Sequence, residues 1–221
     1  MIDQKMYVDN LKQISLTAER ALHKDEPLTK DEKGKLRSIS GQLLWATTHS
    51  RPDAAFDACT ISNYGKEPTV RNILIANKGI KKLQGNQLRL VFPKLGDLRK
   101  LHIITYADAA HANLPSGASQ GGILVLLAGN GKVAPIMWQS KKLSRVTKSP
   151  FAAETMAQAE AADAGVLVAK MAEEVFRIPL PTVECRTDSK SLVDHLGTSH
   201  VIQDSRLRVD IARLKEMVKL N

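Results

Sequence analysis

The chain has 221 residues, 43% of them hydrophobic, which is enough for one large domain or for one domain with a partial neighbour. Its net charge of +9 favours a polyanionic partner such as nucleic acid, although a solvated basic surface without a partner explains the charge equally well. Two cysteines exclude a disulfide framework and a cysteine-based zinc site, and we expect an intracellular protein because neither a secretory leader nor a membrane-spanning stretch is found.

The first 85 residues are predicted to be mainly helical. Apolar residues recur there at helical spacing, and a polar stretch with Pro27 and Gly34 indicates a loop over residues 27–35. Pro52 suits the first turn of a helix that begins at Arg51. The expected helices cover approximately residues 1–26, 33–48, 51 onward and 69–83.

Strand-like patterns follow from about residue 86, so we expect a second domain over residues 86–221. Strands are expected at residues 88–92, 101–107, 121–128, 132–140 and 182–187, and helices at 151–176, from 189, and at 204–219. The sequence Gly129-Asn130-Gly131 is a strong hairpin signal. The order predicts an α/β fold with a mixed sheet of three antiparallel strands, a crossover helix and a further strand, flanked by helices.

Four carboxylates occupy settings that suit metal ligands. Asp108 and Asp188 each follow a predicted strand, Glu154 lies in the first turns of the crossover helix, and Asp210 lies on the last helix. Each has an ordinary structural explanation as well: Asp108 as a solvated strand end, Asp188 as a helix N-cap and Glu154 as a surface carboxylate. Asp210 could instead pair with Arg206 or Arg213, one helical turn away. Together they predict a site at one sheet edge for two Mg²⁺ ions, with Mn²⁺ as an alternative metal.

Several short motifs give these acids a family context. They are YADAAHA at 106–112, IMWQSKKL at 136–143, SPFAAETMA at 149–157, TDSKS at 187–191 and LRVDI at 207–211. In this order they resemble the ribonuclease H domain of copia-type retrotransposon polyproteins. Residues 36–48 and the Arg-Pro-Asp string at 51–53 are similar to the segment that follows the reverse transcriptase palm in the same polyproteins.

The resemblance implies a ribonuclease H-like fold that follows a reverse transcriptase thumb or connection segment at residues 1–85. It implies cleavage of the RNA strand of an RNA–DNA hybrid, with Asp108, Glu154, Asp188 and Asp210 as catalytic metal ligands. His200 is the candidate for a loop histidine that assists product release. An upstream polymerase domain is the expected partner, in a cytoplasmic virus-like particle or in the nucleus.

Three basic residues after the predicted hairpin, Lys141, Lys142 and Arg145, are candidates for phosphate contacts or else belong to a solvated loop. The family pattern changes at Ala110, His111 and Ala152. These changes leave a second function open: a catalytically inactive, nucleic-acid-binding or structural module of a reverse transcriptase fragment. An integrase core is disfavoured, because that class places its glutamate last.

Overall fold

The computed structural model describes residues 1–114, 116–198, 202 and 204–219. The chain forms two compact units, of which the first comprises Met1–Leu90 with Leu114–Ser116 and the second Val91–Asn113 with Gly117–Asn221. The domain boundary expected between residues 85 and 86 lies close to this division. The assignment of the first part to a reverse transcriptase stays a prediction.

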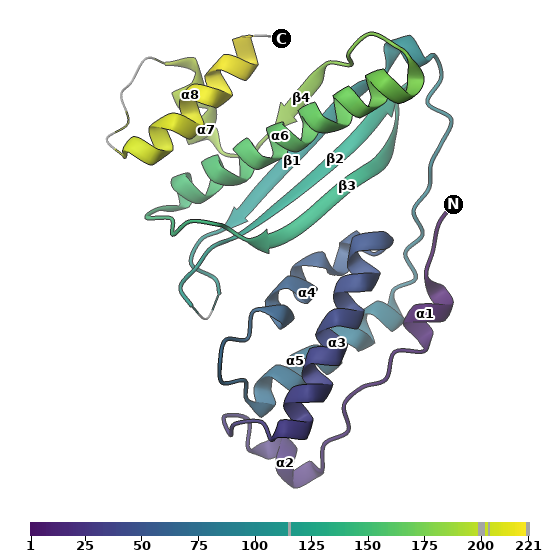
Figure 1. Ribbon diagram of the computed structural model, residues 1–221, viewed down its shortest axis with the longest axis vertical. Helices are drawn as coiled ribbons and strands as arrows, with labels where there is room; N and C mark the ends of the chain where they lie inside the picture. Colours follow the sequence, from purple (N-terminus) through teal and green to yellow (C-terminus); the bar gives the residue numbers. More distant parts are fainter. Residues whose placement is uncertain (115, 199–201, 203, 220–221) are drawn as a thin grey trace. The chain divides into compact units, whose positions relative to one another are not determined.

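The first unit is helical, as expected (Figure 1). Its elements are α1 (Lys5–Asp9), α2 (Ala18–Leu22), α3 (Lys30–His49), the 3₁₀ turn η1 (Pro52–Ala54), α4 (Ala55–Ser62) and α5 (Val70–Gly85). Its core is formed mainly by apolar side chains of the three longer helices, including the fully buried Leu36, Ile73 and Ile80. The helical spacing of these residues in the sequence therefore marked the face that is buried.

Two expectations for this unit are wrong. The helix expected over residues 1–26 is replaced by the short α1 and α2, joined by an extended stretch. Side chains of α5 bind the backbone of this stretch: the amide of Asn77 pairs with both the N–H and the carbonyl of Ile14, and Gln84 donates to the carbonyl of Leu11. The strand expected at 88–92 is reduced to one bridge between Leu90 and Ile2.

Helix α3 begins at Lys30, three residues earlier than the sequence predicts, because its first turn is fully capped. The hydroxyl of Thr29 accepts from the N–H of Glu32, and the Glu32 carboxylate accepts from the N–H of Thr29. The guanidinium of Arg20 also binds Glu32, at 2.9 and 3.1 Å. This capping box fixes the start of the helix.

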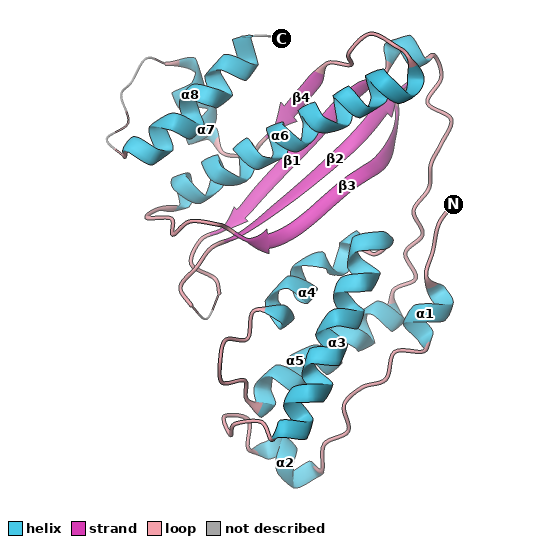
Figure 2. Cartoon of the chain, viewed as in Figure 1, coloured by secondary structure: helices cyan, strands magenta, loops and turns pink. Residues whose placement is uncertain are grey.

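The second unit contains the predicted mixed sheet (Figure 2). Its elements are η2 (Leu98–Lys100), β1 (His102–Ala110), β2 (Gln120–Gly129), β3 (Lys132–Lys142), α6 (Pro150–Phe176), β4 (Val183–Arg186), α7 (Lys190–Gly197) and α8 (Ser205–Lys219). The strand order is β3-β2-β1-β4, with β1, β2 and β3 antiparallel and β4 parallel to β1. Asn130 and Gly131 have positive φ, as a tight β2–β3 hairpin turn requires.

Helix α6 lies along one face of the sheet, close to its backbone (Figure 1). Glycine permits this approach: a Cβ on Gly165 would lie 2.6 Å from Cγ2 of Thr105 and 2.8 Å from Cγ1 of Val183. Helices α7 and α8 pack against α6 through a separate apolar cluster that includes Leu192, Ile211 and Leu214. Among the described residues, no helix is long and apolar enough to cross a membrane.

Candidate metal centre

The parallel pairing of β1 and β4 brings two of the predicted acids together. Tyr106 on β1 pairs with Arg186 on β4, and Asp108 and Asp188 each lie two residues farther along their strand direction. Both side chains are exposed. Asp188 is not the N-cap of α7, because that position is held by Ser189. The structural explanation of Asp188 as a helix cap is therefore wrong.

Glu154 reaches the same edge of the sheet from α6. Ser149 caps this helix by accepting from the N–H of Ala152, and Glu154 follows in the next turn. The backbone N–H of Ala109 donates to the Glu154 carboxylate. Partial burial raises the pKa of the Glu154 carboxyl, the charges of Asp108 and Asp188 raise it further, and the hydrogen bond from Ala109 opposes both effects.

The three acids form one cluster, in which one carboxylate oxygen from each of Asp108, Glu154 and Asp188 lies within 4.8 Å of the other two. No Lys, Arg or His in the described part of the chain forms an ion pair with any of them. Three hard oxygen donors that repel one another and lack a counter-charge fit a divalent cation such as Mg²⁺ or Mn²⁺. The negative charges of Asp108 and Asp188 raise the pKa of Glu154, and a bound cation would relieve this repulsion.

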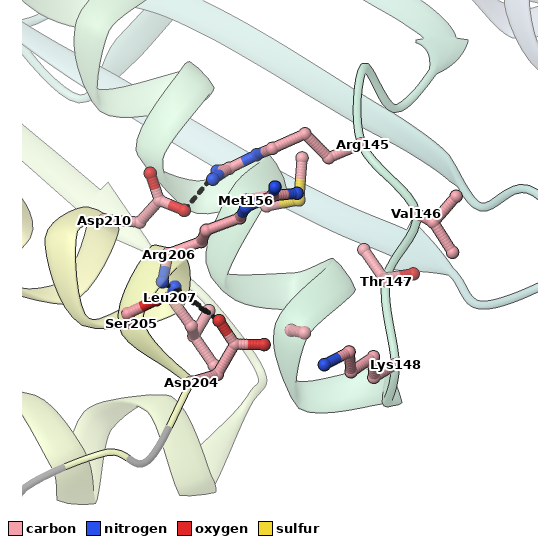
Figure 3. A pocket seen from close by; sticks show the side chains of 11 residues that line it. Arg145, Val146, Thr147, Lys148, Met156, Asp204, Ser205, Arg206, Leu207 and Asp210 are labelled. Carbon is pink, nitrogen blue, oxygen red and sulfur yellow. Dashed lines mark hydrogen bonds and ion pairs between the residues drawn. The ribbon is translucent and has the colours of Figure 1, made fainter.

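Asp210 is not brought into this cluster. Its carboxylate pairs instead with the guanidinium of Arg145, from the loop between β3 and α6 (Figure 3). Both residues line a pocket of about 470 Å³, together with Lys148, Asp204 and Arg206. The arginines suggested by the sequence as partners of Asp210 are therefore not those that bind it, and Arg213 pairs with Asp163. The role of Asp210 as a fourth metal ligand stays a prediction.

The remaining predicted site residues are three basic residues after the hairpin and one histidine. Lys141 forms an ion pair of 3.1 Å with Glu160 on α6, whereas Lys142, the last residue of β3, is exposed. Arg145 is held by Asp210 as described above. His200 lies outside the described residues. The roles of the three basic residues in phosphate binding stay predictions.

Two features of the site carry no signal in the sequence. The first is the backbone N–H of Ala109, which any residue at that position would supply. The second is a network of hydrogen bonds that fixes the loop before α6: the hydroxyls of Ser119 and Thr147 lie 2.6 Å apart, and Nε2 of His111 lies 3.2 Å from the Thr147 carbonyl. Only the fold brings these residues together.

The chain resembles known proteins in sequence and, at low identity, in structure. No protein-family model matches the chain. The chain is 32% identical over 117 residues to the transposon Ty5-1 protein YCL074W of Saccharomyces cerevisiae. The match takes in 52% of this chain and 35% of that protein, so the chain spans well under half the length of this relative.

Two solved structures are similar at low identity. LC11-RNase H1, isolated from compost by a metagenomic approach, is 18% identical with a TM-score of 0.38, over 54% of this chain and 77% of that one. The prototype foamy virus protease-reverse transcriptase is 14% identical with a TM-score of 0.31, over 70% of this chain and 23% of that one. The predicted resemblance to a retrotransposon protein is confirmed by the yeast relative, over about half of the chain.

Proposed function

We propose that this chain is a retrotransposon-derived ribonuclease H, which hydrolyses the RNA strand of RNA–DNA hybrids. The observation that carries the proposal is the cluster of Asp108, Glu154 and Asp188, whose oxygens converge at the end of two parallel strands without a basic partner among the described residues. The similarity to a yeast transposon protein supports the retrotransposon origin.

The carboxylates of Asp108, Glu154 and Asp188 would hold the divalent cations. Bound Mg²⁺ would activate a water and stabilise the leaving 3′ oxygen of the cleaved phosphodiester. The N–H of Ala109 on β1 donates to the Glu154 carboxylate on α6, so the two elements that carry ligands are in contact at the sheet edge. Asp210 is proposed as a fourth ligand, which requires its release from Arg145.

A hybrid would be recognised by its shape, phosphates and 2′-hydroxyls rather than by its sequence. The net charge of +9 supports attraction of such a polyanion. Lys142 is exposed at the end of β3 and is proposed to contact a phosphate, with Arg145 and Lys141 as further candidates. An upstream polymerase domain is the proposed partner of the first unit.

The test is cleavage of an end-labelled RNA–DNA hybrid with and without Mg²⁺. We expect cleavage by the wild-type chain to require the metal and to be abolished by Asp108→Asn with the fold retained. Asp163→Asn is the matched control, since Asp163 also lies in the second unit but pairs with Arg213. Cleavage by the Asp108→Asn protein at the wild-type rate would disprove the site.

A second candidate is a catalytically inactive, hybrid-binding or structural module. The pairing of Asp210 with Arg145 favours it, because this pair leaves the cluster with three acids. In that case the wild-type chain would bind the hybrid without cleaving it in either Mg²⁺ or Mn²⁺. Retention of a labelled hybrid on the protein, measured beside the cleavage assay, separates the two functions.

A further inference from the structure

Gln158 on α6 is a buried polar residue that the proposed chemistry does not use. The residue is only 2% exposed, and neither Nε2 nor Oε1 of its side chain has a hydrogen-bond partner in the described part of the chain. A buried amide without partners costs free energy that an apolar side chain of the same size would not. Packing alone therefore does not account for glutamine at this position.

The position of Gln158 on the helix is informative. Glu154, Gln158 and Gly165 fall within an arc of about 40° on one side of α6, since the helix turns 100° per residue. The two outer members of this line both contact β1: Glu154 accepts from the N–H of Ala109, and Gly165 lies against Thr105. Gln158 therefore faces the sheet between these contacts, one helical turn behind Glu154.

We propose that Gln158 is a positioning residue of the metal centre, which orients the carboxylate of Glu154 for cation binding. This inference rests on the proposed function. Side chains four residues apart on a helix are neighbours, and long side chains lean toward the helix N-terminus, so the turn that carries Glu154 is within reach of the Gln158 amide. Nε2 has no hydrogen-bond partner in the described part of the chain, and in the proposed cation-bound state it donates to the Glu154 carboxylate oxygen that the cation leaves free.

Such outer hydrogen bonds fix the orientation of a ligating carboxylate and thereby raise its affinity for the metal. The amide is neutral, so it stabilises the Glu154 carboxylate without adding a positive charge that would compete with the cation. A lysine or arginine at this position would instead neutralise the cluster and weaken cation binding.

The test is Mn²⁺ binding measured by calorimetry on the whole chain, together with urea unfolding of the same metal-free samples. Gln158→Met keeps the length of the side chain and removes its hydrogen-bonding groups. We expect about tenfold weaker Mn²⁺ binding, typical of the loss of an outer hydrogen bond to a metal ligand. Unfolding of the metal-free variant should occur at the same or a higher urea concentration.

Thr105→Val is the matched control. Oγ1 of Thr105 is the other buried side-chain group without a partner among the described residues, and this residue also contacts α6. The valine variant should bind Mn²⁺ as the wild type does. Equal weakening by both variants would overturn the proposal, because it would indicate a general loosening between α6 and the sheet.

Unchanged Mn²⁺ affinity in a folded Gln158→Met protein would also overturn the role of Gln158 while leaving the metal centre intact. Absence of Mn²⁺ binding by the wild-type chain would instead disprove the metal centre itself, and the role of Gln158 with it. The two failures are therefore distinguishable from the same set of titrations.

Discussion

The backbone N–H of Ala109 donates to the carboxylate of Glu154 and thereby ties the start of α6 to the end of β1. The burial of Glu154 and the negative charges of Asp108 and Asp188 raise its pKa, and the hydrogen bond from Ala109 offsets only part of this rise. The cluster is therefore strained electrostatically when no cation is bound. Metal binding and stability must be linked at this site.

The first prediction concerns the metal-free stability of the cluster. A carboxyl with a raised pKa in the folded state contributes stability that is lost as pH rises through that pKa. In Glu154→Gln the side chain stays neutral at every pH, so this loss of stability does not occur. The metal-free variant should therefore melt at a higher temperature than the wild type at pH 7. The difference should shrink as the pH falls below the ordinary carboxyl range.

Thermal unfolding in a chelator, between pH 4 and pH 8, is the measurement. Glu160→Gln on the same helix is the control, because Glu160 pairs with Lys141 and its loss should not stabilise the protein. A Glu154→Gln protein that melts below the wild type at pH 7 without metal would show that the cluster is not repulsive.

The second prediction concerns the pair of Arg145 and Asp210. The pair is partly exposed, with 36% and 19% of the respective side chains accessible, so we expect a coupling free energy of about 0.5–1 kcal/mol. A double-mutant cycle with Arg145→Gln and Asp210→Asn, read by urea unfolding, measures it. Asp210→Asn should weaken Mn²⁺ binding less than Asp108→Asn does, because Asp210 must first leave Arg145 before it can bind the metal. Unchanged Mn²⁺ binding in Asp210→Asn would show that Asp210 is not a fourth ligand.

The third prediction concerns acid unfolding of the first unit. Hydrogen bonds from Arg20 lower the pKa of the Glu32 carboxyl from 4.5 to about 2, with help from the N–H of Thr29. A lowered carboxyl pKa contributes stability that is present above pH 4.5 and lost as the pH falls toward 2. Glu32→Gln should therefore lower the free energy of unfolding at pH 7 by about 1–3 kcal/mol.

The effect of this substitution should diminish at low pH, which urea titrations at several pH values can follow. Glu67→Gln provides the comparison, since Glu67 pairs with Lys33 but its side chain is 76% exposed. We expect that change to be nearly neutral. Similar effects of the two substitutions would contradict the special role of Glu32.

The fourth prediction concerns the contact between α6 and the sheet. Gly165→Ala should destabilise the second unit by about 1–3 kcal/mol, because its Cβ would clash with Thr105 and Val183. Gly41→Ala on α3 has open space around the added methyl group and should stabilise the protein by about 0.5–1 kcal/mol. Urea unfolding of both variants gives the comparison, and a neutral Gly165→Ala would disprove the close packing.

Elements with strong local signals could be predicted from the sequence. The Asn130-Gly131 turn, the alternating strands beside it and the long α6 all lie close to their expected positions, because turn chemistry and periodicity act over a few residues. The helix expected over residues 1–26 could not be excluded in this way. The backbone of this segment is bound by the side chains of Asn77 and Gln84, which lie far away in the sequence.

The sequence by itself determined which residue types stand at the ends of the strands and at the start of α6, since strand and helix patterns depend on near neighbours. It thereby predicted one site for Asp108, Glu154, Asp188 and Asp210, and the structure brings the first three together. Only the tertiary structure decided that Asp210 turns to Arg145, that Ala109 holds Glu154, and that Gln158 is buried without a partner. These relations depend on how α6 and α8 pack, and side-chain partners across such an interface are set by shape and charge over long sequence separations.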